Sequence, residues 1–235
     1  MDTEYEAGVE MGKFFADKGI KTAAIYGAFI PNPMHVYRTA GVLAGLGLSY
    51  GGATTEEDVV GLIFADQGID LSKISGDIKI VSYLQGYGDT TTDEINAAIQ
   101  AAPEAFISVG MATTFFTQQL NAAGIEFSDI DSFTKSNGEA ITNGKLVYLA
   151  GKYSSSVGPA FALVMNAING NVIRDAQGNA VSLSQNYQVA TDSETFDKFY
   201  KNDNGDNPIY SRDTLDQIIG DTVTFDTINE VVASN

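Results

Sequence analysis

The sequence predicts an α/β fold: a doubly wound parallel sheet, followed by a C-terminal β-hairpin and short helices. Between residues 22 and 170, short apolar runs alternate at least four times with segments of helix length, which is typical of parallel strands joined by crossover helices. The chain has 235 residues, 44% of them hydrophobic, so it can bury a substantial core. After residue 170 the alternation gives way to turn-rich and acidic segments.

The first half of the chain contains a helix, a buried strand and a second helix. Residues 2–18 place apolar side chains at helical spacing and end at Gly19. Residues 22–26 form a continuous apolar run, which favours a strand covered on both faces. Asn32 and Pro33 then supply a capping side chain and a fixed φ, so we expect a helix from there to Leu46. Residues 48–76 are less regular, with a helix cap at residues 54–57.

The second half continues the alternation. We expect strands at residues 78–84, 105–109 and 146–150, a strand-to-helix transition at 127–133, and helices at 90–102 and 113–123. The three serines at 154–156 predict a helix cap, and the helix reaches residue 170. Residues 172–189 read as a β-hairpin around 175–179, a plain turn rather than a calcium loop. Short acidic helices are expected at 194–200, 211–220 and 225–232.

The composition restricts the function. The formal charge is -17, from 30 acidic and 13 basic residues, which disfavours nucleic acid and anionic membrane surfaces as partners. The chain has no cysteine and one histidine, so disulfides, thiolate catalysis, histidine triads and the usual zinc clusters are excluded. We expect no metal and no cofactor. His35 is expected at the helix surface or at a loop edge.

Polar residues follow the predicted strands and are candidates for ligand binding. Arg38 lies near the start of the helix that follows the first strand, facing the carboxyl end of the sheet, where open α/β folds bind ligands. Tyr87 lies between two glycines after the strand 78–84, and Asp89 follows it. An exposed aromatic ring stacks on sugar rings while a carboxylate accepts hydroxyl hydrogen bonds. Lys152 follows the strand 146–150, where it can donate into the same crevice. A tight turn around a buried Tyr87, or a solvated Lys152, is an equal alternative.

Five segments in succession carry a family resemblance. They are DTEYEAGVEMGKFFADKG at 2–19, AAIYGAFIPNPMHVYRTAG at 23–41, the loop 87–89, FISVGMATTFFTQQLNAAGI at 106–125, and AITNGKLVYLAGKYSSSVGPAFALVMNAINGN at 140–171. Together they resemble the type I periplasmic sugar-binding proteins of ABC importers, over about two thirds of the chain. The chain departs from that pattern at residues 109–111, where Val-Gly-Met replaces the Asn-Asp of many members.

The resemblance implies a non-catalytic binding protein that closes like a hinge on a sugar or a similar small polar ligand. It places the entry aspartate at Asp2, the ligand arginine at Arg38 and the stacking aromatic at or near Tyr87. The ligand carboxylate falls on Asp131 or its neighbour Ser132, and the polar residue beside the hinge on Lys152.

The resemblance also implies how the chain is organised. Residues 1–151 correspond to the second, Rossmann-like lobe, and 152–235 supply a helix, hairpin and acidic tail that would complete the other lobe, most of which this sequence lacks. We therefore expect an extracellular or periplasmic protein, a cell-surface lipoprotein with its leader removed, that works with a membrane permease and does not itself enter the membrane. A ligand-sensing domain of a transcriptional regulator or receptor is the alternative, and a flavodoxin-like enzyme is a weaker one.

Overall fold

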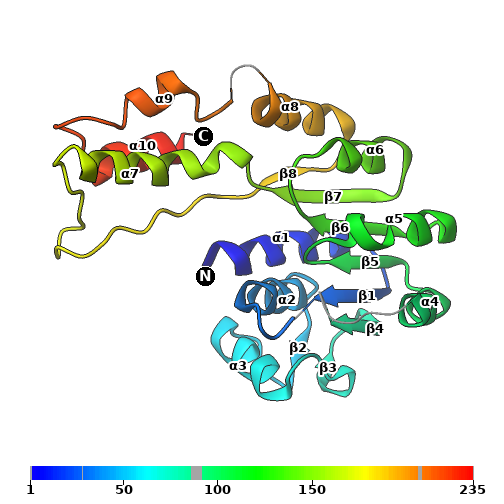
Figure 1. Cartoon of the computed structure of the whole chain (residues 1–235). Helices are drawn as coiled ribbons and strands as arrows, with labels where there is room; N and C mark the ends of the chain where they lie inside the picture. Colours follow the sequence, from blue (N-terminus) through cyan, green and yellow to red (C-terminus); the bar gives the residue numbers. More distant parts are fainter. Residues whose placement is uncertain (1, 28, 86–91, 206–207, 235) are drawn as a thin grey trace.

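The structure is a computed structural model that describes residues 2–27, 29–85, 92–205 and 208–234 (Figure 1). The strands are β1 Thr22–Gly27, β2 Ser49–Tyr50, β3 Ile74–Ser75, β4 Lys79–Gln85, β5 Ala105–Ser108, β6 Glu126–Ile130, β7 Leu146–Gly151 and β8 Gln188–Ala190. The helices are α1 Asp2–Asp17, α2 Pro33–Gly45, α3 Glu56–Asp66, α4 Thr92–Gln100, α5 Ala112–Ala123, α6 Lys135–Asn143, α7 Gly158–Ile168, α8 Ser193–Asn204, α9 Arg212–Asp216 and α10 Phe225–Ala233, with short 3₁₀ turns η1 Leu71–Lys73 and η2 Ser154–Val157.

One six-stranded sheet organises most of the chain. Its strand order is β4-β1-β5-β6-β7-β8, and the five strands from β4 to β7 run parallel. The last strand, β8, pairs antiparallel with β7, placing Ala190 opposite Leu149. Strands β2 and β3 form a separate two-stranded antiparallel sheet beside α3, within the stretch of less regular sequence. The predicted α/β class is confirmed.

Helices cover both faces of the sheet, because the side chains of each buried strand alternate between two apolar layers. On β1, Ala23 and Ile25 pack in the layer that contains α1, α2 and α3. Ala24 and Tyr26 pack in the opposite layer, with α4, α5, α6 and α8. The sheet is therefore doubly wound, as the sequence predicts.

Local sequence signals fix several element ends. The Asn32 side chain accepts a hydrogen bond from the Met34 amide and Pro33 follows it, so α2 begins where the sequence predicts. Thr55 caps α3 by accepting from the Asp58 amide. At the end of α5, Gly124 adopts a left-handed conformation with a φ of +72°, which glycine tolerates without strain.

Glycines bring α1 and α2 into close contact. A Cβ at Gly8 would overlap the carbonyl oxygen of Arg38, and a Cβ at Gly41 would overlap that of Tyr5. Gly12 and Gly45 repeat the arrangement one turn further along. The backbones of the two helices therefore approach more closely than side chains would allow, and α1 is held firmly against α2.

Beside the sheet lies a smaller body, which we call the α7 unit: residues 154–187 and 208–234, containing α7, α9 and α10 (Figure 1). Its core is small and consists of Ala162, Ile173, Ile218, Ile228 and Val232, with partly buried neighbours around them. Residues 181–187 form an extended segment that leads into β8 and has no strand pairing of its own. Residues 188–204 leave this unit, since β8 joins the sheet and α8 packs on α6.

Two predictions for the C-terminal part are wrong. The hairpin at 172–189 is reduced to a tight turn at Asp175 and one β-bridge between Arg174 and Ala180. Residues 181–187 are unpaired, and only the end of the second arm, Gln188 and Val189, pairs with β7, which offers a free edge of the main sheet. The serines at 154–156 do not cap α7: Ser154 binds the Asp203 carboxylate through its amide and its hydroxyl, and η2 leads into the helix.

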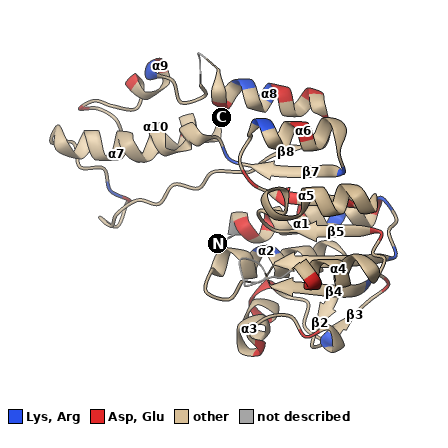
Figure 2. Ribbon diagram, turned by 45° about the vertical axis from the view of Figure 1, so that its right-hand side comes forward, with Lys and Arg blue, Asp and Glu red and all other residues tan. Residues whose placement is uncertain are grey.

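The short acidic helices of the tail are confirmed as α8, α9 and α10. Acidic residues lie on helices on several sides of the molecule, whereas α7 carries no charged residue (Figure 2). In the part of the chain that the structure describes, no helix has the length and hydropathy needed to cross a membrane.

Candidate functional site

Arg38 lies in the second turn of α2, at the carboxyl edge of the sheet. Its Nη1 donates a hydrogen bond of 3.0 Å to the carbonyl oxygen of Val109, the residue that follows β5. The residue is only 8% exposed, so its guanidinium is buried rather than open to a crevice. The sequence therefore predicted correctly that Arg38 lies at this edge of the sheet, but it did not predict that the side chain is buried.

The main partner of Arg38 is Glu4, from the first turn of α1. Arg38 Nε lies 2.6 Å from Glu4 Oε2, and both side chains are almost fully buried. Tyr187, one residue before β8, completes a triangle: Arg38 Nη2 donates to its hydroxyl at 2.6 Å, and that hydroxyl donates to Glu4 Oε2 at 2.8 Å. A buried charge pair is thus satisfied by additional hydrogen bonds, the condition under which such a pair is tolerated.

Lys152 joins the same group from the residue after β7. Its Nζ lies 3.4 Å from Glu4 Oε1 and 4.4 Å from the centre of the Tyr187 ring, a cation–π distance. The Lys152 side chain remains 31% exposed, so of the two cations it is the one that solvent or a ligand reaches. We refer to Glu4, Arg38, Lys152 and Tyr187 as the Glu4 cluster.

The charges of the cluster act on its titrating groups. Burial raises the pKa of Glu4, but the Arg38 charge, the hydrogen bonds from Tyr187 and Arg38, and the Lys152 charge outweigh it, so the pKa ends below the usual value. Burial also raises the pKa of the Tyr187 hydroxyl well above its usual value. Glu4 is therefore a carboxylate at neutral pH and Tyr187 a neutral hydroxyl that can donate.

His35 lies on the same helix and is 1% exposed, so the expectation of a helix-surface or loop-edge position is wrong. The helix turns this side chain inward, toward the Phe29 ring, whose centre lies 6.4 Å from that of the imidazole. Burial lowers the pKa of His35 to about 4, helped by the Arg38 charge and opposed by Glu4. The imidazole is neutral at physiological pH.

Asp131 follows β6, and its amide donates to the carbonyl of Ala150, so it lies at the same edge as Lys152. Its carboxylate accepts from the Ser132 amide at 2.7 Å, the Ser132 hydroxyl at 3.2 Å and Asn137 Nδ2 at 3.3 Å. These bonds organise the loop that enters α6 and leave the carboxylate partly buried. No described contact joins Asp131 to the Glu4 cluster.

The remaining predicted site residues are only partly placed. Asp2 begins α1, two positions before Glu4, and its side chain is not among those described. Tyr87 and Asp89 lie outside the described residues; they follow the carboxyl end of β4 in the sequence. The structure therefore brings together Arg38 and Lys152, and places Asp131 at the neighbouring strand end.

Sequence reasoning missed Glu4 and Tyr187. Glu4 occupies the first turn of an amphipathic helix, where an acidic residue is ordinary, and Tyr187 lies in a polar stretch without a motif. Sequence reasoning also did not single out Asp129, a fully buried carboxylate in β6. It accepts hydrogen bonds from the amide and the hydroxyl of Thr113 at 2.7 and 2.6 Å. Asp129 stabilises the start of α5 and is a structural residue.

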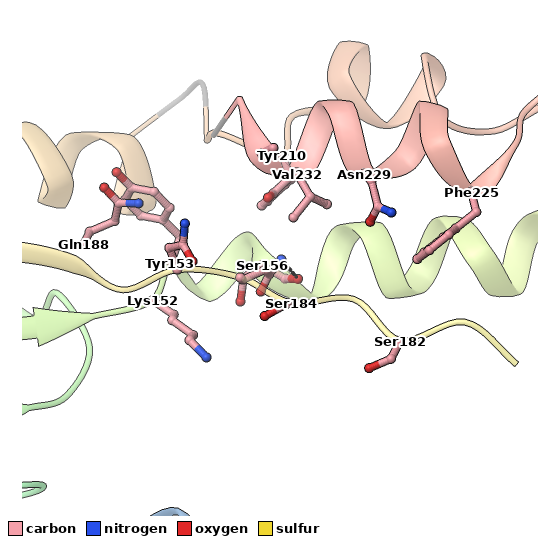
Figure 3. A pocket seen from close by; sticks show the side chains of 13 residues that line it. Lys152, Tyr153, Ser156, Ser182, Ser184, Gln188, Tyr210, Phe225, Asn229 and Val232 are labelled. Carbon is pink, nitrogen blue, oxygen red and sulfur yellow. Dashed lines mark hydrogen bonds between the residues drawn. The ribbon is translucent and has the colours of Figure 1, made fainter. Parts of the chain in front are cut away.

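A pocket of about 500 Å³ adjoins the cluster, between the segment before β8, α10 and the residues after β7 (Figure 3). Hydroxyl and amide groups of Ser182, Ser184, Gln188 and Asn229 line it, together with aromatic rings such as Tyr210. Lys152 lies at its rim, with its amino group turned away from α10 (Figure 3). Such a lining can hydrogen-bond a polyol.

The arrangement offers hydrogen-bond donors, hydrogen-bond acceptors and aromatic rings. Across residues 2–27, 29–85, 92–205 and 208–234, no three acidic or histidine side chains gather in a way that would hold a metal ion.

No known protein-family profile matches the chain, and no curated protein matches it. Solved structures do match. An ABC transporter periplasmic solute-binding protein from Actinobacillus succinogenes, with bound D-allose, matches at 15% identity and a TM-score of 0.54, over 84% of this chain and 61% of that one. A galactofuranose-binding protein matches at 10% identity and a TM-score of 0.56, over 86% and 62%.

A third match is the periplasmic binding component of the arabinose ABC transporter from Shewanella, bound to α- and β-L-arabinofuranose. Its identity is 16% and its TM-score 0.53, over 86% of this chain and 61% of that one. At such identities the likeness concerns the fold, and it confirms the fold that the sequence resemblance implied: that of the type I periplasmic binding proteins of ABC transporters. The chain spans about three fifths of the length of these proteins.

Proposed function

We propose that this chain is the larger part of an extracytoplasmic solute-binding protein, which captures a sugar or a similar small polar ligand for the permease of an ABC importer. The observation that carries the proposal is the meeting of Arg38 and Lys152 at the carboxyl edge of a sheet whose fold matches sugar-binding proteins. Open parallel sheets bind their ligands at that edge. We infer that binding is non-catalytic.

Each candidate residue has a role in this proposal. Lys152, the more exposed cation, donates to ligand hydroxyls, and Asp131 accepts from them. Arg38 is only 8% exposed, so its main role in the proposal is to hold Glu4 and Tyr187 beside Lys152, and contact with the ligand would be limited to the guanidinium N–H groups that Glu4, Val109 and Tyr187 do not use. Asp2, Tyr87 and Asp89 complete the proposed site from the start of α1 and the loop after β4, with Tyr87 stacking on the sugar ring.

We also propose the two-part organisation. Residues 1–151 form the second ligand-binding lobe, and 152–235 complete the other lobe, apart from β8 and α8, which return to the first sheet. The supporting observation is the outer face of α7 and of the residue before it, where Val157, Phe161, Val164 and Ile168 are 51 to 70% exposed at helical spacing. Large apolar side chains aligned in this way are typical of a face that another layer covers.

The cellular context belongs to the same proposal. The protein would work outside the cytoplasm, in the periplasm or as a cell-surface lipoprotein after removal of a leader. Its partners would be the small ligand and a membrane permease, with no nucleic acid and no membrane insertion by the described part. The formal net charge of -17 agrees with this, because it repels phosphate groups.

The first prediction concerns binding itself. Titration of the isotope-labelled chain with D-allose, L-arabinose and galactose, followed by NMR, should show saturable shifts of amides at 131–132 and 150–153. We expect a Kd of roughly 1 mM, because part of the enclosing surface would belong to the other lobe. Lys152→Met should weaken binding about 10-fold or more, since losing a charged donor costs about 1.5–3 kcal/mol.

The matched control is Lys198→Met, which removes an exposed lysine on α8, on the other side of the sheet from the Glu4 cluster. It should leave the affinity unchanged. The proposal fails if no sugar shifts these amides although the chain is folded, or if Lys152→Met and Lys198→Met bind equally well.

A further inference from the structure

The α7 unit is attached to the sheet by three crossing segments, which leave β7, enter β8 and leave α8. Two of them carry a member of the Glu4 cluster: Lys152 is the first residue after β7, and Tyr187 is the last residue before β8. We propose that the Glu4 cluster is a hinge lock, which ties these two crossing segments to α1 and α2 and so fixes the orientation of the α7 unit.

The contacts converge on one carboxylate. Glu4 Oε2 accepts from Arg38 Nε at 2.6 Å and from the Tyr187 hydroxyl at 2.8 Å, while Glu4 Oε1 faces Lys152 Nζ at 3.4 Å. Arg38 also donates to the Tyr187 hydroxyl through Nη2, and through Nη1 to the carbonyl oxygen of Val109, the residue after β5. Removing the Glu4 charge therefore loosens both crossing segments at once.

The base of the lock is rigid. Gly8 and Gly41 hold the α1 backbone directly against α2, so Glu4 and Arg38 cannot move apart without separating two close-packed helices. The crossing residues, by contrast, are single positions beyond the ends of β7 and β8, and 181–187 has no strand pairing. A hinge consists of such terminal residues, which absorb changes in φ and ψ.

Other contacts hold the crossing segments without fixing them to α1 and α2. Ser154 binds Asp203, and Gln185 Nε2 donates to the Ser156 carbonyl at 2.8 Å, both between segments of the crossing region. Tyr153 packs against Phe133 on the opposite side of the sheet. On the α1–α2 side, the described side-chain hydrogen bonds and ion pairs to these segments are those of the Glu4 cluster.

Burial makes the lock a two-state device. The Arg38 and Glu4 side chains are 9% and 8% exposed, so removing one partner leaves a buried charge unpaired. The cluster is then either closed as a whole or opened to water, and intermediate arrangements are unfavourable. The lock does not require a bound solute, so its test is independent of the proposed transport function.

The test measures the distance between the two bodies. The chain has no native cysteine, so spin labels at Ala160→Cys on α7 and Gln118→Cys on α5, both exposed, report one distance by pulsed electron resonance. With the lock intact we expect one narrow distribution. Glu4→Gln should broaden it about two-fold or more, or add a second distance, because the open state becomes populated.

Three further variants keep the test decisive. Glu6→Gln removes an exposed carboxylate of the same helix and should leave the distribution narrow. Tyr187→Phe removes only a hydroxyl and should also broaden the distribution, and combining it with Glu4→Gln should add little, since both open the same lock. A narrow distribution in folded Tyr187→Phe, or in Glu4→Gln with native circular dichroism, would overturn the proposal.

Discussion

At the scale of single residues, His35 gives the clearest pH dependence. Its pKa of about 4 in the folded protein lies below the 6.5 of an unperturbed histidine, so the unfolded chain binds more protons between these values. The histidine's contribution to stability is complete above about pH 6.5 and is lost as the pH falls toward 4. From pH 7 to 4 this amounts to on the order of 3 kcal/mol.

The measurement compares denaturant unfolding of the native protein and of His35→Gln at several pH values. Asp129 acts in the opposite direction: burial raises its pKa to about 6, above the ordinary 3.8, so its proton stabilises the fold as the pH falls through 6. Because Asp129 is present in both proteins, the difference between them isolates His35. Equal slopes between pH 4 and 6.5 would show that His35 does not cause the loss.

The sequence predicted some members of the cluster and not others, for a physical reason. Arg38 and Lys152 follow predicted strands, so the topology alone places them at one edge of the sheet. Glu4 and Tyr187 are 34 and 149 residues from Arg38 along the chain, and no local spacing records such a pairing. The burial that sets the His35 pKa depends in the same way on helix rotation and packing.

At the scale of elements, the crossing of α1 and α2 is the most sensitive contact. Gly41→Ala places a methyl group on the Tyr5 carbonyl oxygen, and rigid backbone must then move. We expect a loss of about 3 kcal/mol or more in the free energy of unfolding, measured by urea denaturation, because overpacking against backbone finds no flexible side chain to displace.

Gly61→Ala in α3 is the matched control, because a Cβ at Gly61 meets no atom within 4 Å. There the methyl group should be neutral or stabilising by up to about 1 kcal/mol, since alanine favours helices over glycine. A similar small effect at Gly41 would mean that the two helices do not cross as closely as described.

Predictions of helices and strands succeeded where residues within one turn determine the structure. They failed where pairing with a sheet edge distant in the sequence determines it. The start of α2 depends on Asn32 and Pro33, which act within one turn, and the structure has it as predicted. The hairpin at 172–189 has suitable turn residues, yet residues 181–187 stay unpaired and the end of the second arm pairs with β7, which is distant in sequence. Ser154 likewise has a side chain that could cap a helix, but its hydroxyl donates a hydrogen bond to the Asp203 carboxylate instead.

At the scale of the whole molecule, alternation of strands and helices sufficed to predict the doubly wound sheet. Each short apolar run must be covered on both faces, and crossover helices satisfy that requirement for every parallel strand. The arrangement of residues 152–235 did not follow from pattern, because their core of five buried residues is too small to define a packing by itself. The same small core leaves a stripe of apolar side chains exposed along α7, at Val157, Phe161, Val164 and Ile168.

The exposed apolar stripe on α7 can be tested by introducing a charge at its centre. Phe161 is 51% exposed at the centre of an uncharged apolar face, so Phe161→Lys should leave the free energy of unfolding within about 0.5 kcal/mol. It should also sharply reduce binding of an apolar dye such as ANS, because the contiguous patch is interrupted. Phe115→Lys is the control: Phe115 is 48% exposed but lies on α5, away from the stripe, and its loss should change dye binding little. Strong destabilisation by Phe161→Lys would instead mean that this chain covers the face itself, and no further part of the other lobe would be needed there.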